Sequence, residues 1–221
     1  MARPPLRYLK DPAEIYRRSF ETVRREARLG RFPPSMRPLV MRLIHASGMV
    51  AIADRIAFSP EAAEVGADAL AAGASILCDC SMVAAGIIRT RLPAENEVVV
   101  TLHDPAVQAL ARDLCTTRSA AAVELWRSRL EGAVVAIGNA PTALFHLLER
   151  LDEGWPRPAV ILGFPVGFVG AAESKAALAA DPRGAEFVTL RGRRGGSAMA
   201  AAAVNALAAG LPGEGKEGTD D

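Results

Sequence analysis

A histidine near the end of a predicted helix is the residue of this 221-residue chain that most clearly could do chemistry. His45 is one of three histidines, and it lies just before Gly48, a residue type that commonly ends helices. Arg42 lies three residues earlier, so on a helix both side chains project from one face and could bind a single ligand. Histidine can donate or accept a proton near neutral pH. The alternative is a structural, half-buried histidine beside a surface arginine, which is the commoner case for a lone histidine.

Helical periodicity surrounds this pair. Ser35 is a candidate N-cap, and it is followed by apolar residues at helical spacing, which are Met36, Leu39, Val40, Leu43 and Ile44. An earlier amphipathic helix is predicted from Asp11 and Pro12, which resemble a capping residue with proline at the first helical position, to about Ala27. Another helix is predicted from Pro60 to about Ala72. The amino-terminal part of the chain is therefore expected to be helical.

From residue 75 onward the pattern changes to short apolar runs separated by alanine-rich helical segments. The runs comprise residues 75–78, 98–102, 133–137, 159–162 and 187–190. Their hydrophobicity is continuous rather than alternating, as expected for strands covered by helices on both faces of a parallel sheet. We therefore predict an α/β fold of three layers, with a doubly wound, five-stranded parallel sheet and extra N-terminal helices. The length suits one domain, residues 1–209, and the Gly- and charge-rich residues 210–221 are predicted to be a disordered tail.

Small and polar residues follow four of the predicted strands, at residues 78–81, 138–142, 163–167 and 191–193. In doubly wound folds ligands bind beyond the carboxyl ends of the strands, so these loops are candidate ligand contacts. Ordinary turn chemistry is the alternative. The glycine-rich residues 163–170 lack the Gly-x-Gly-x-x-Gly spacing and follow the fourth strand, so they are a weak cofactor motif. His103 and His146 are interpreted as structural.

Composition excludes several classes of protein. Basic and acidic residues nearly balance, at 26 and 25, and they are interspersed without a basic run, so we expect no nucleic-acid partner. No apolar stretch has the length of a signal peptide or a membrane span, which predicts a cytoplasmic protein without membrane contact. Three irregularly spaced cysteines predict reduced thiols and no zinc site. Most basic residues are arginines, whose planar fork suits carboxylates and phosphates, although a biased base composition would also enrich arginine.

Seven segments, taken in order, resemble the precorrin-8X methylmutase family of cobalamin biosynthesis, also known in a cobalt-precorrin-8 form. They are residues 15–20, 44–48, 58–60, 76–79, 117–121, 135–144 and 163–175. The resemblance covers nearly the whole chain. It implies a flavodoxin-like sheet, a homodimer, and a methyl shift from C11 to C12 of the corrinoid ring that needs no cofactor and no metal. It also suggests neighbouring enzymes of the pathway as partners.

The resemblance places the family's catalytic histidine on His45 and its substrate-contacting serine and arginine on Ser19 and Arg42. Arg118 and Ser119 match a further family segment that we expect near the substrate. A histidine suits the implied reaction because moving a proton on or near a ring nitrogen would assist a sigmatropic methyl shift. The substrate carries acetate and propionate carboxylates, which these arginines could bind. Further candidates for this role are Arg17, Arg89, Arg91, Arg191 and Arg193.

A second hypothesis is a non-catalytic protein that binds or carries a corrinoid, with His45 acting only as a hydrogen-bond donor. The sequence leaves open whether the natural ring is metal-free or contains cobalt, because neither form requires a protein ligand to the metal. A bound corrinoid chromophore would identify the ligand.

Overall fold

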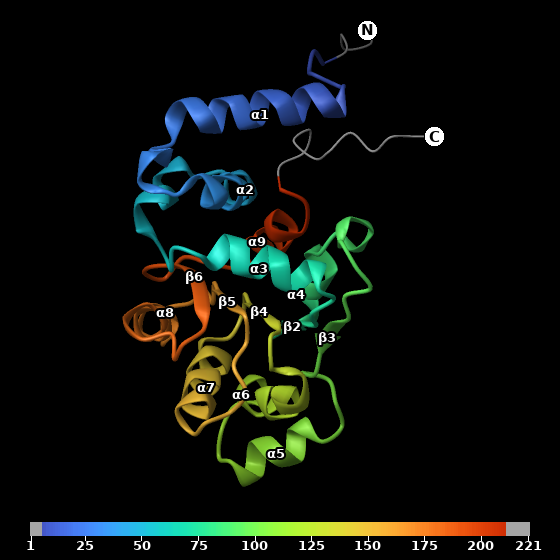
Figure 1. Cartoon of the computed structure of the whole chain (residues 1–221), viewed down its shortest axis with the longest axis vertical. Helices are drawn as coiled ribbons and strands as arrows, with labels where there is room; N and C mark the ends of the chain where they lie inside the picture. The colour runs from blue at the N-terminus through green and yellow to red at the C-terminus, as the bar shows by residue number, and fades with distance from the viewer. Residues whose placement is uncertain (1–5, 211–221) are drawn as a thin grey trace, which may run out of the picture.

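A mixed six-stranded sheet forms the centre of the protein in the computed structural model, which describes residues 6–210 (Figure 1). Its strands are β1 (Ile56–Phe58), β2 (Ile76–Cys78), β3 (Val98–Val100), β4 (Val134–Ile137), β5 (Val160–Gly163) and β6 (Glu186–Leu190). They are ordered β1-β6-β5-β4-β2-β3, and all neighbours are parallel except the antiparallel pair β1 and β6. The five predicted strands correspond to β2 to β6, and their order is that of a flavodoxin-like sheet.

The prediction of a five-stranded, wholly parallel sheet was wrong in one respect, because β1 adds a sixth strand. Its register pairs Ile56 with Leu190 and Phe58 with Val188. A run of three residues between helical segments is too short to show strand periodicity. It becomes a strand because β6, far along the chain, offers a free edge for hydrogen bonding.

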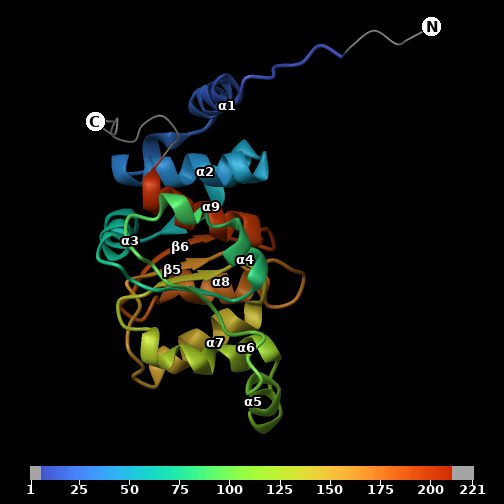
Figure 2. The same ribbon diagram turned by 90° about the vertical axis from the view of Figure 1, so that its right-hand side faces the viewer.

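Helices cover both faces of the sheet, and the first two form an additional layer (Figure 2). One face is covered by α3 (Ala62–Ala71), α4 (Ser81–Gly86) and α9 (Ser197–Ala209), and the other by α5 (Val107–Asp113), α6 (Arg118–Val123), α7 (Pro141–Asp152) and α8 (Ala171–Ala180). The extra layer consists of α1 (Pro12–Glu26) and α2 (Arg37–Ser47), and α2 packs on α9. The predicted three-layer sandwich with N-terminal helices is confirmed.

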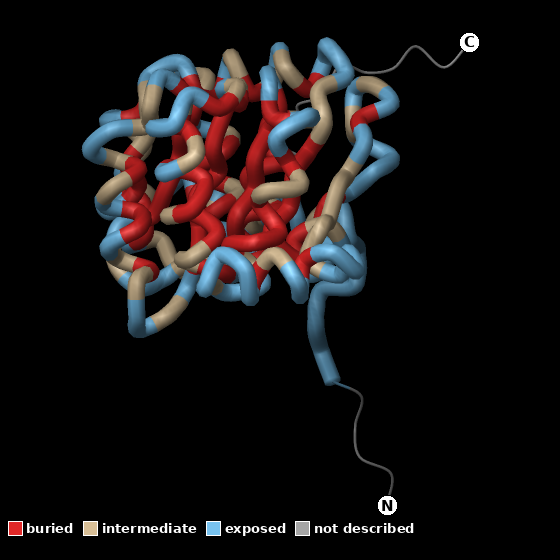
Figure 3. The backbone as a smooth tube through the Cα atoms, turned by 90° about the horizontal axis from the view of Figure 1, so that it is seen from below, coloured by how far each residue is buried: buried red, intermediate tan, exposed pale blue. Residues whose placement is uncertain are grey.

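The hydrophobic core is divided by the sheet into two parts, because successive strand residues face opposite layers. On β4, Val134 and Ala136 belong to the cluster beneath α2, α3 and α9, whereas Val135 and Ile137 pack with α7 and α8. Figure 3 shows the buried residues concentrated along these strands, while the segment leading into α1 is exposed. The helix layers are therefore held by burial of apolar surface on both faces.

Local signals set the ends of the two outer helices. The Asp11 side chain accepts a hydrogen bond from the Ala13 amide at 3.0 Å, and α1 begins at Pro12 as predicted. Gly48 ends α2 in the left-handed conformation, with φ +65°. The predicted Ser35 cap is wrong. A 3₁₀ turn over Pro34–Met36 precedes α2, because the preceding prolines hold the backbone in a turn, and no side chain caps the helix.

Three further expectations concern the cysteines, membrane spans and the C-terminal tail. Cys78, Cys80 and Cys115 are all free thiols. None of the helices in residues 6–210 is long and apolar enough to span a membrane. The predicted disordered tail lies outside the described residues, apart from Gly210.

Candidate active site

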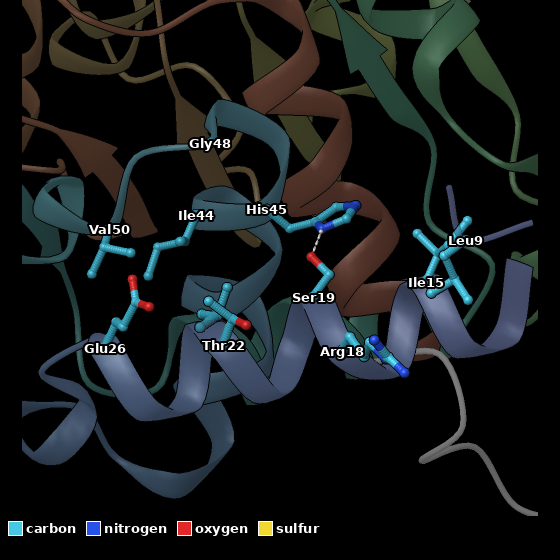
Figure 4. A pocket seen from close by; sticks show the side chains of 11 residues that line it. Leu9, Ile15, Arg18, Ser19, Thr22, Glu26, Ile44, His45, Gly48 and Val50 are labelled. Atoms are coloured by element: carbon cyan, nitrogen blue, oxygen red, sulfur yellow. Dashed lines mark hydrogen bonds between the residues drawn. The ribbon is translucent and has the colours of Figure 1, made fainter. Parts of the chain in front are cut away.

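A pocket of about 520 Å³ lies between α1 and α2 and contains His45 (Figure 4). Its lining is a mixture of apolar and polar side chains from these helices and their flanking segments. The lining residues are Leu9, Ile15, Arg18, Ser19, Thr22, Val23, Glu26, Ile44, His45, Gly48 and Val50. Leu9 and Ile15 are exposed apolar residues at one end of it. The pocket therefore offers apolar contact area together with a group that can transfer protons.

Ser19 and His45 meet across the two helices. The Ser19 hydroxyl is hydrogen-bonded to Nδ1 of His45 at 2.8 Å, and the second ring nitrogen points away from Ser19 (Figure 4). No hydrogen bond within the described residues reaches that second nitrogen, Nε2. The rings of Tyr16 and Phe20 lie beside the imidazole, at centroid distances of 5.7 and 5.1 Å. The imidazole is thus held by the hydrogen bond at Nδ1 and by the neighbouring aromatic rings. Its Nε2 is available for proton transfer.

The α1 residues reach His45 because of helical spacing. Phe20 and Val23 are buried and anchor α1 against α2. Ser19 and Phe20 follow Tyr16 by three and four residues, so all three lie on the helix face that this anchoring turns toward α2. Sequence reasoning did not identify Tyr16 and Phe20 as site residues. The available signal was that Tyr16 precedes Ser19 and Phe20 by three and four residues.

Electrostatics at the site favour the neutral imidazole. Partial burial lowers the pKa of His45, and the nearby positive charge of Arg42 lowers it further. Burial likewise lowers the pKa of Arg42, and the charge of Arg91 adds to this effect. Arg42 donates from Nε to the carbonyl of Gly210, but its buried Nη2 has no hydrogen-bond partner among residues 6–210. One end of the guanidinium is therefore buried without a hydrogen-bond partner among the described residues, and Arg42 is not one of the residues that line the pocket.

Ion pairs along α1 engage other charged groups near the pocket. Glu14 accepts hydrogen bonds from Arg17 and Arg18, at 2.7 and 2.6 Å, and these partners lower its pKa to about 2. Arg17 also pairs with Glu21 at 2.5 Å. Arg17, a candidate for binding a substrate carboxylate, is thus already engaged with two carboxylates on its own helix.

Arg118 and Ser119 lie on the opposite side of the sheet from His45 (Figure 1). They begin α6, whose N-cap Thr117 accepts a hydrogen bond from the Ala120 amide at 3.2 Å. Arg118 is exposed and Ser119 is partly buried. Within one chain, the structure joins Ser19 to His45 by a hydrogen bond and lets the charge of Arg42 act on His45 from outside the pocket lining. Arg118 and Ser119 are not brought to His45.

The other two histidines differ in their surroundings. His146 is buried, and its Nε2 lies 2.6 Å from a carboxylate oxygen of Glu124, an arrangement that fits its predicted structural role. His103 is exposed in a turn.

The strand ends, where a ligand was expected, are occupied partly by the protein itself. Asp79 follows β2 at the switch point beside β4, and its buried carboxylate accepts hydrogen bonds from the amides of Gly138, Asn139 and Ala140, at 2.8 to 2.9 Å. The His45 pocket lies instead between the outer helices. Among residues 6–210, no cluster of three or more His, Cys, Asp or Glu side chains is arranged to bind a metal ion.

Known proteins match this chain over most of its length. The family model described as precorrin-8X methylmutase matches residues 14–209. The chain belongs to the precorrin-8X methylmutase family. Precorrin-8X methylmutase from Pseudomonas aeruginosa is 63% identical over 201 residues, covering 91% of this chain and 97% of that protein. Cobalt-precorrin-8 methylmutase from Priestia megaterium is 36% identical, covering 89% and 87%.

The fold is shared as well. The crystal structure of precorrin-8X methylmutase from Thermus thermophilus has a TM-score of 0.80 and 42% identity, and the match covers 88% of this chain and 94% of that one. Precorrin-8X methylmutases are isomerases, and this chain is therefore an isomerase of cobalamin biosynthesis. The resemblance on which the sequence analysis relied is confirmed.

Proposed function

We propose that this methylmutase moves a methyl group from C11 to C12 of precorrin-8X, giving hydrogenobyrinate, or of cobalt-precorrin-8, giving cobyrinate, and that His45 carries the proton. The observation that supports this best is the Ser19–His45 hydrogen bond of 2.8 Å in a pocket lined by apolar and polar side chains. Relatives named for both substrates match the chain, so the metal content of its own substrate stays open.

The covalent bonds that change in this reaction lie within the substrate. One carbon–carbon bond breaks at C11, one forms at C12, and substrate and product contain the same atoms. The protein needs only to take a proton from the ring system and return one to it. With Nδ1–H donating to Ser19, the Nε2 lone pair of a neutral His45 can accept a proton and then return it. The apolar residues of the lining would hold the ring in a reactive geometry.

A His45→Ala variant tests this mechanism. Positioned proton transfer typically contributes about 10²- to 10⁴-fold in rate, so turnover should fall by that factor. Binding of hydrogenobyrinate, followed by its absorbance, should change little, because the other groups of the pocket are retained. Thr22→Ala, at another pocket residue, is a matched control that should retain most of the turnover. Near-normal turnover by His45→Ala would contradict the catalytic role.

We also propose that the protein is a homodimer. Arg118 and Ser119 face away from the His45 pocket of their own chain, and a second copy is the arrangement that would let them contribute to one ring-binding site. The exposed apolar side chains of Phe168 and Val169, at 85% and 89% exposure, are candidates for such contacts. Sedimentation analysis of the purified protein tests this. A cytoplasmic location and binding of neighbouring pathway enzymes stay predictions.

A further inference from the structure

Tyr16 lies against His45 but outside the pocket. Its ring centroid is 5.7 Å from that of the imidazole, and the two ring planes are inclined by 32°. Tyr16 is not among the described residues that line the pocket, whereas its neighbours Ile15 and Ser19 on α1 are. Tyr16 therefore touches the imidazole from outside the space in which a substrate would bind, and any effect on the reaction would act through His45.

Two aromatic rings of α1 enclose the imidazole at different depths. Phe20 is buried, at 3% exposure, and its ring stacks on the imidazole with centroids 5.1 Å apart and planes inclined by 25°. Tyr16 is 45% exposed, and its ring is stacked with that of Phe20 at a centroid distance of 6.4 Å. Phe20 thus supports the imidazole from the core, and Tyr16 covers it closer to the surface.

The orientation of the imidazole requires more than one contact. The Ser19 hydroxyl holds Nδ1 of His45 at 2.8 Å, but a single hydrogen bond lets the ring plane turn about that contact. The neighbouring aromatic rings restrict this turning, because a turned imidazole would collide with them. The direction of Nε2 is therefore set by the hydrogen bond and the two rings together. This matters for the rate, since a misplacement of about 1 Å can cost about 100-fold.

We propose that Tyr16 is a positioning residue for the methyl shift, and that its ring keeps the His45 imidazole in the orientation that presents Nε2 to the substrate. This role rests on the proposed function, because it acts only through proton transfer by His45. The contacts that carry the role are made by the aromatic ring of Tyr16. A phenylalanine at this position should therefore serve as well.

Steady-state kinetics of the full chain with precorrin-8X compares two substitutions of Tyr16. Tyr16→Leu keeps an apolar side chain but removes the ring, so kcat should fall about tenfold, the upper end of what one aromatic pair contributes. KM should change by less than about twofold, because Tyr16 does not line the described pocket. Tyr16→Phe should keep kcat within about twofold of the wild type. Tyr16 is chosen over the buried Phe20 because its partial exposure makes folding of both variants less sensitive, which thermal unfolding checks.

A double-mutant cycle separates positioning from a merely structural role. In single turnovers, Tyr16→Leu should lower the rate about tenfold in the wild type but by less than about twofold in the His45→Ala background, where no imidazole is left to position. Tyr8→Leu is the matched control. It removes the other tyrosine of the chain, whose ring lies 5.2 Å from the ammonium group of Lys10, and it should leave kcat unchanged.

The pKa of His45 provides a second readout. Burial lowers this pKa, so removing the Tyr16 ring should raise it in an NMR titration. The charged groups near the imidazole are Arg42 on α2 and, across the pocket on α1, Arg18 and Glu26, and the substitution leaves all three in place. Helix α9, on which α2 packs, has no charged side chain.

Three results would overturn the role of Tyr16 while leaving proton transfer by His45 intact. They are an unchanged kcat in Tyr16→Leu, an equal loss in Tyr16→Phe, and a tenfold loss that persists in the His45→Ala background. A pKa of His45 that stays fixed or falls in Tyr16→Leu would contradict the role as well. Near-normal turnover by His45→Ala alone would instead overturn the proposed function.

Discussion

Lys175 should make the free energy of unfolding of this protein rise between about pH 8 and pH 10.5. The residue lies on α8, and its side chain is completely buried, at 0% exposure. Its ammonium group donates to the backbone carbonyl of Arg194 and forms no ion pair with a carboxylate in the described residues. Burial without a compensating charge lowers the pKa of Lys175 from 10.5 to about 8.

The sign of the effect follows from proton binding in the two states. Between pH 8 and 10.5 the unfolded chain keeps the lysine proton while the folded protein has lost it, so the unfolded state binds more protons and stability rises with pH. Below pH 8 both states are protonated, and the full burial cost of about 3 kcal/mol is present. From pH 7 to 9.5 the free energy of unfolding should gain about 2 kcal/mol from this residue.

Urea unfolding of the wild type and of Lys175→Met, at both pH values, measures this gain. Methionine keeps the length of the side chain and cannot titrate, so the difference between wild type and variant should change by about 2 kcal/mol. Lys10→Met is the control, because the exposed Lys10 remains in water in both states, and its curve should parallel the wild type. Since the chain has three lysines, isotope labelling would also follow Lys175 directly by NMR. A pH-independent difference between wild type and Lys175→Met would refute the reasoning.

Two other outcomes test the site and the packing. Arg42→Gln should raise the pKa of His45, because the positive charge of Arg42 lowers it in the wild type. An NMR titration in which the midpoint of His45 stays fixed or falls would contradict this. Gly138→Ala should destabilise the protein by about 1 to 3 kcal/mol, because the new Cβ would lie 2.6 Å from the backbone Cα of Ser197. Gly30→Ala, where a Cβ meets nothing within 4 Å, should change the free energy of unfolding by less than about 0.5 kcal/mol in thermal or urea unfolding.

Features set by neighbouring residues could be predicted from the sequence. Asp11 and Pro12 begin α1, and Gly48 ends α2, because capping and the left-handed conformation depend on a few adjacent residues. The five long apolar runs became β2 to β6, because continuous burial on both faces leaves a continuous apolar pattern. The role of His45, in contrast, came from the resemblance to a family, since helical spacing alone is equally consistent with a structural histidine.

The tertiary structure decided which distant residues meet. Strand β1 forms because the edge of β6 is free to pair with it. Three residues are too few to show a strand's periodicity, so the sequence does not predict this strand. Ser19 reaches His45 only because Phe20 and Val23 turn one face of α1 onto α2. The same packing leaves Arg118 on the far side of the sheet and brings the charge of Arg91 to Arg42. The sequence by itself thus determined the helices, most strands and the residue types available for chemistry. Their grouping into a site depended on how the layers pack, because contacts between distant segments leave no local pattern.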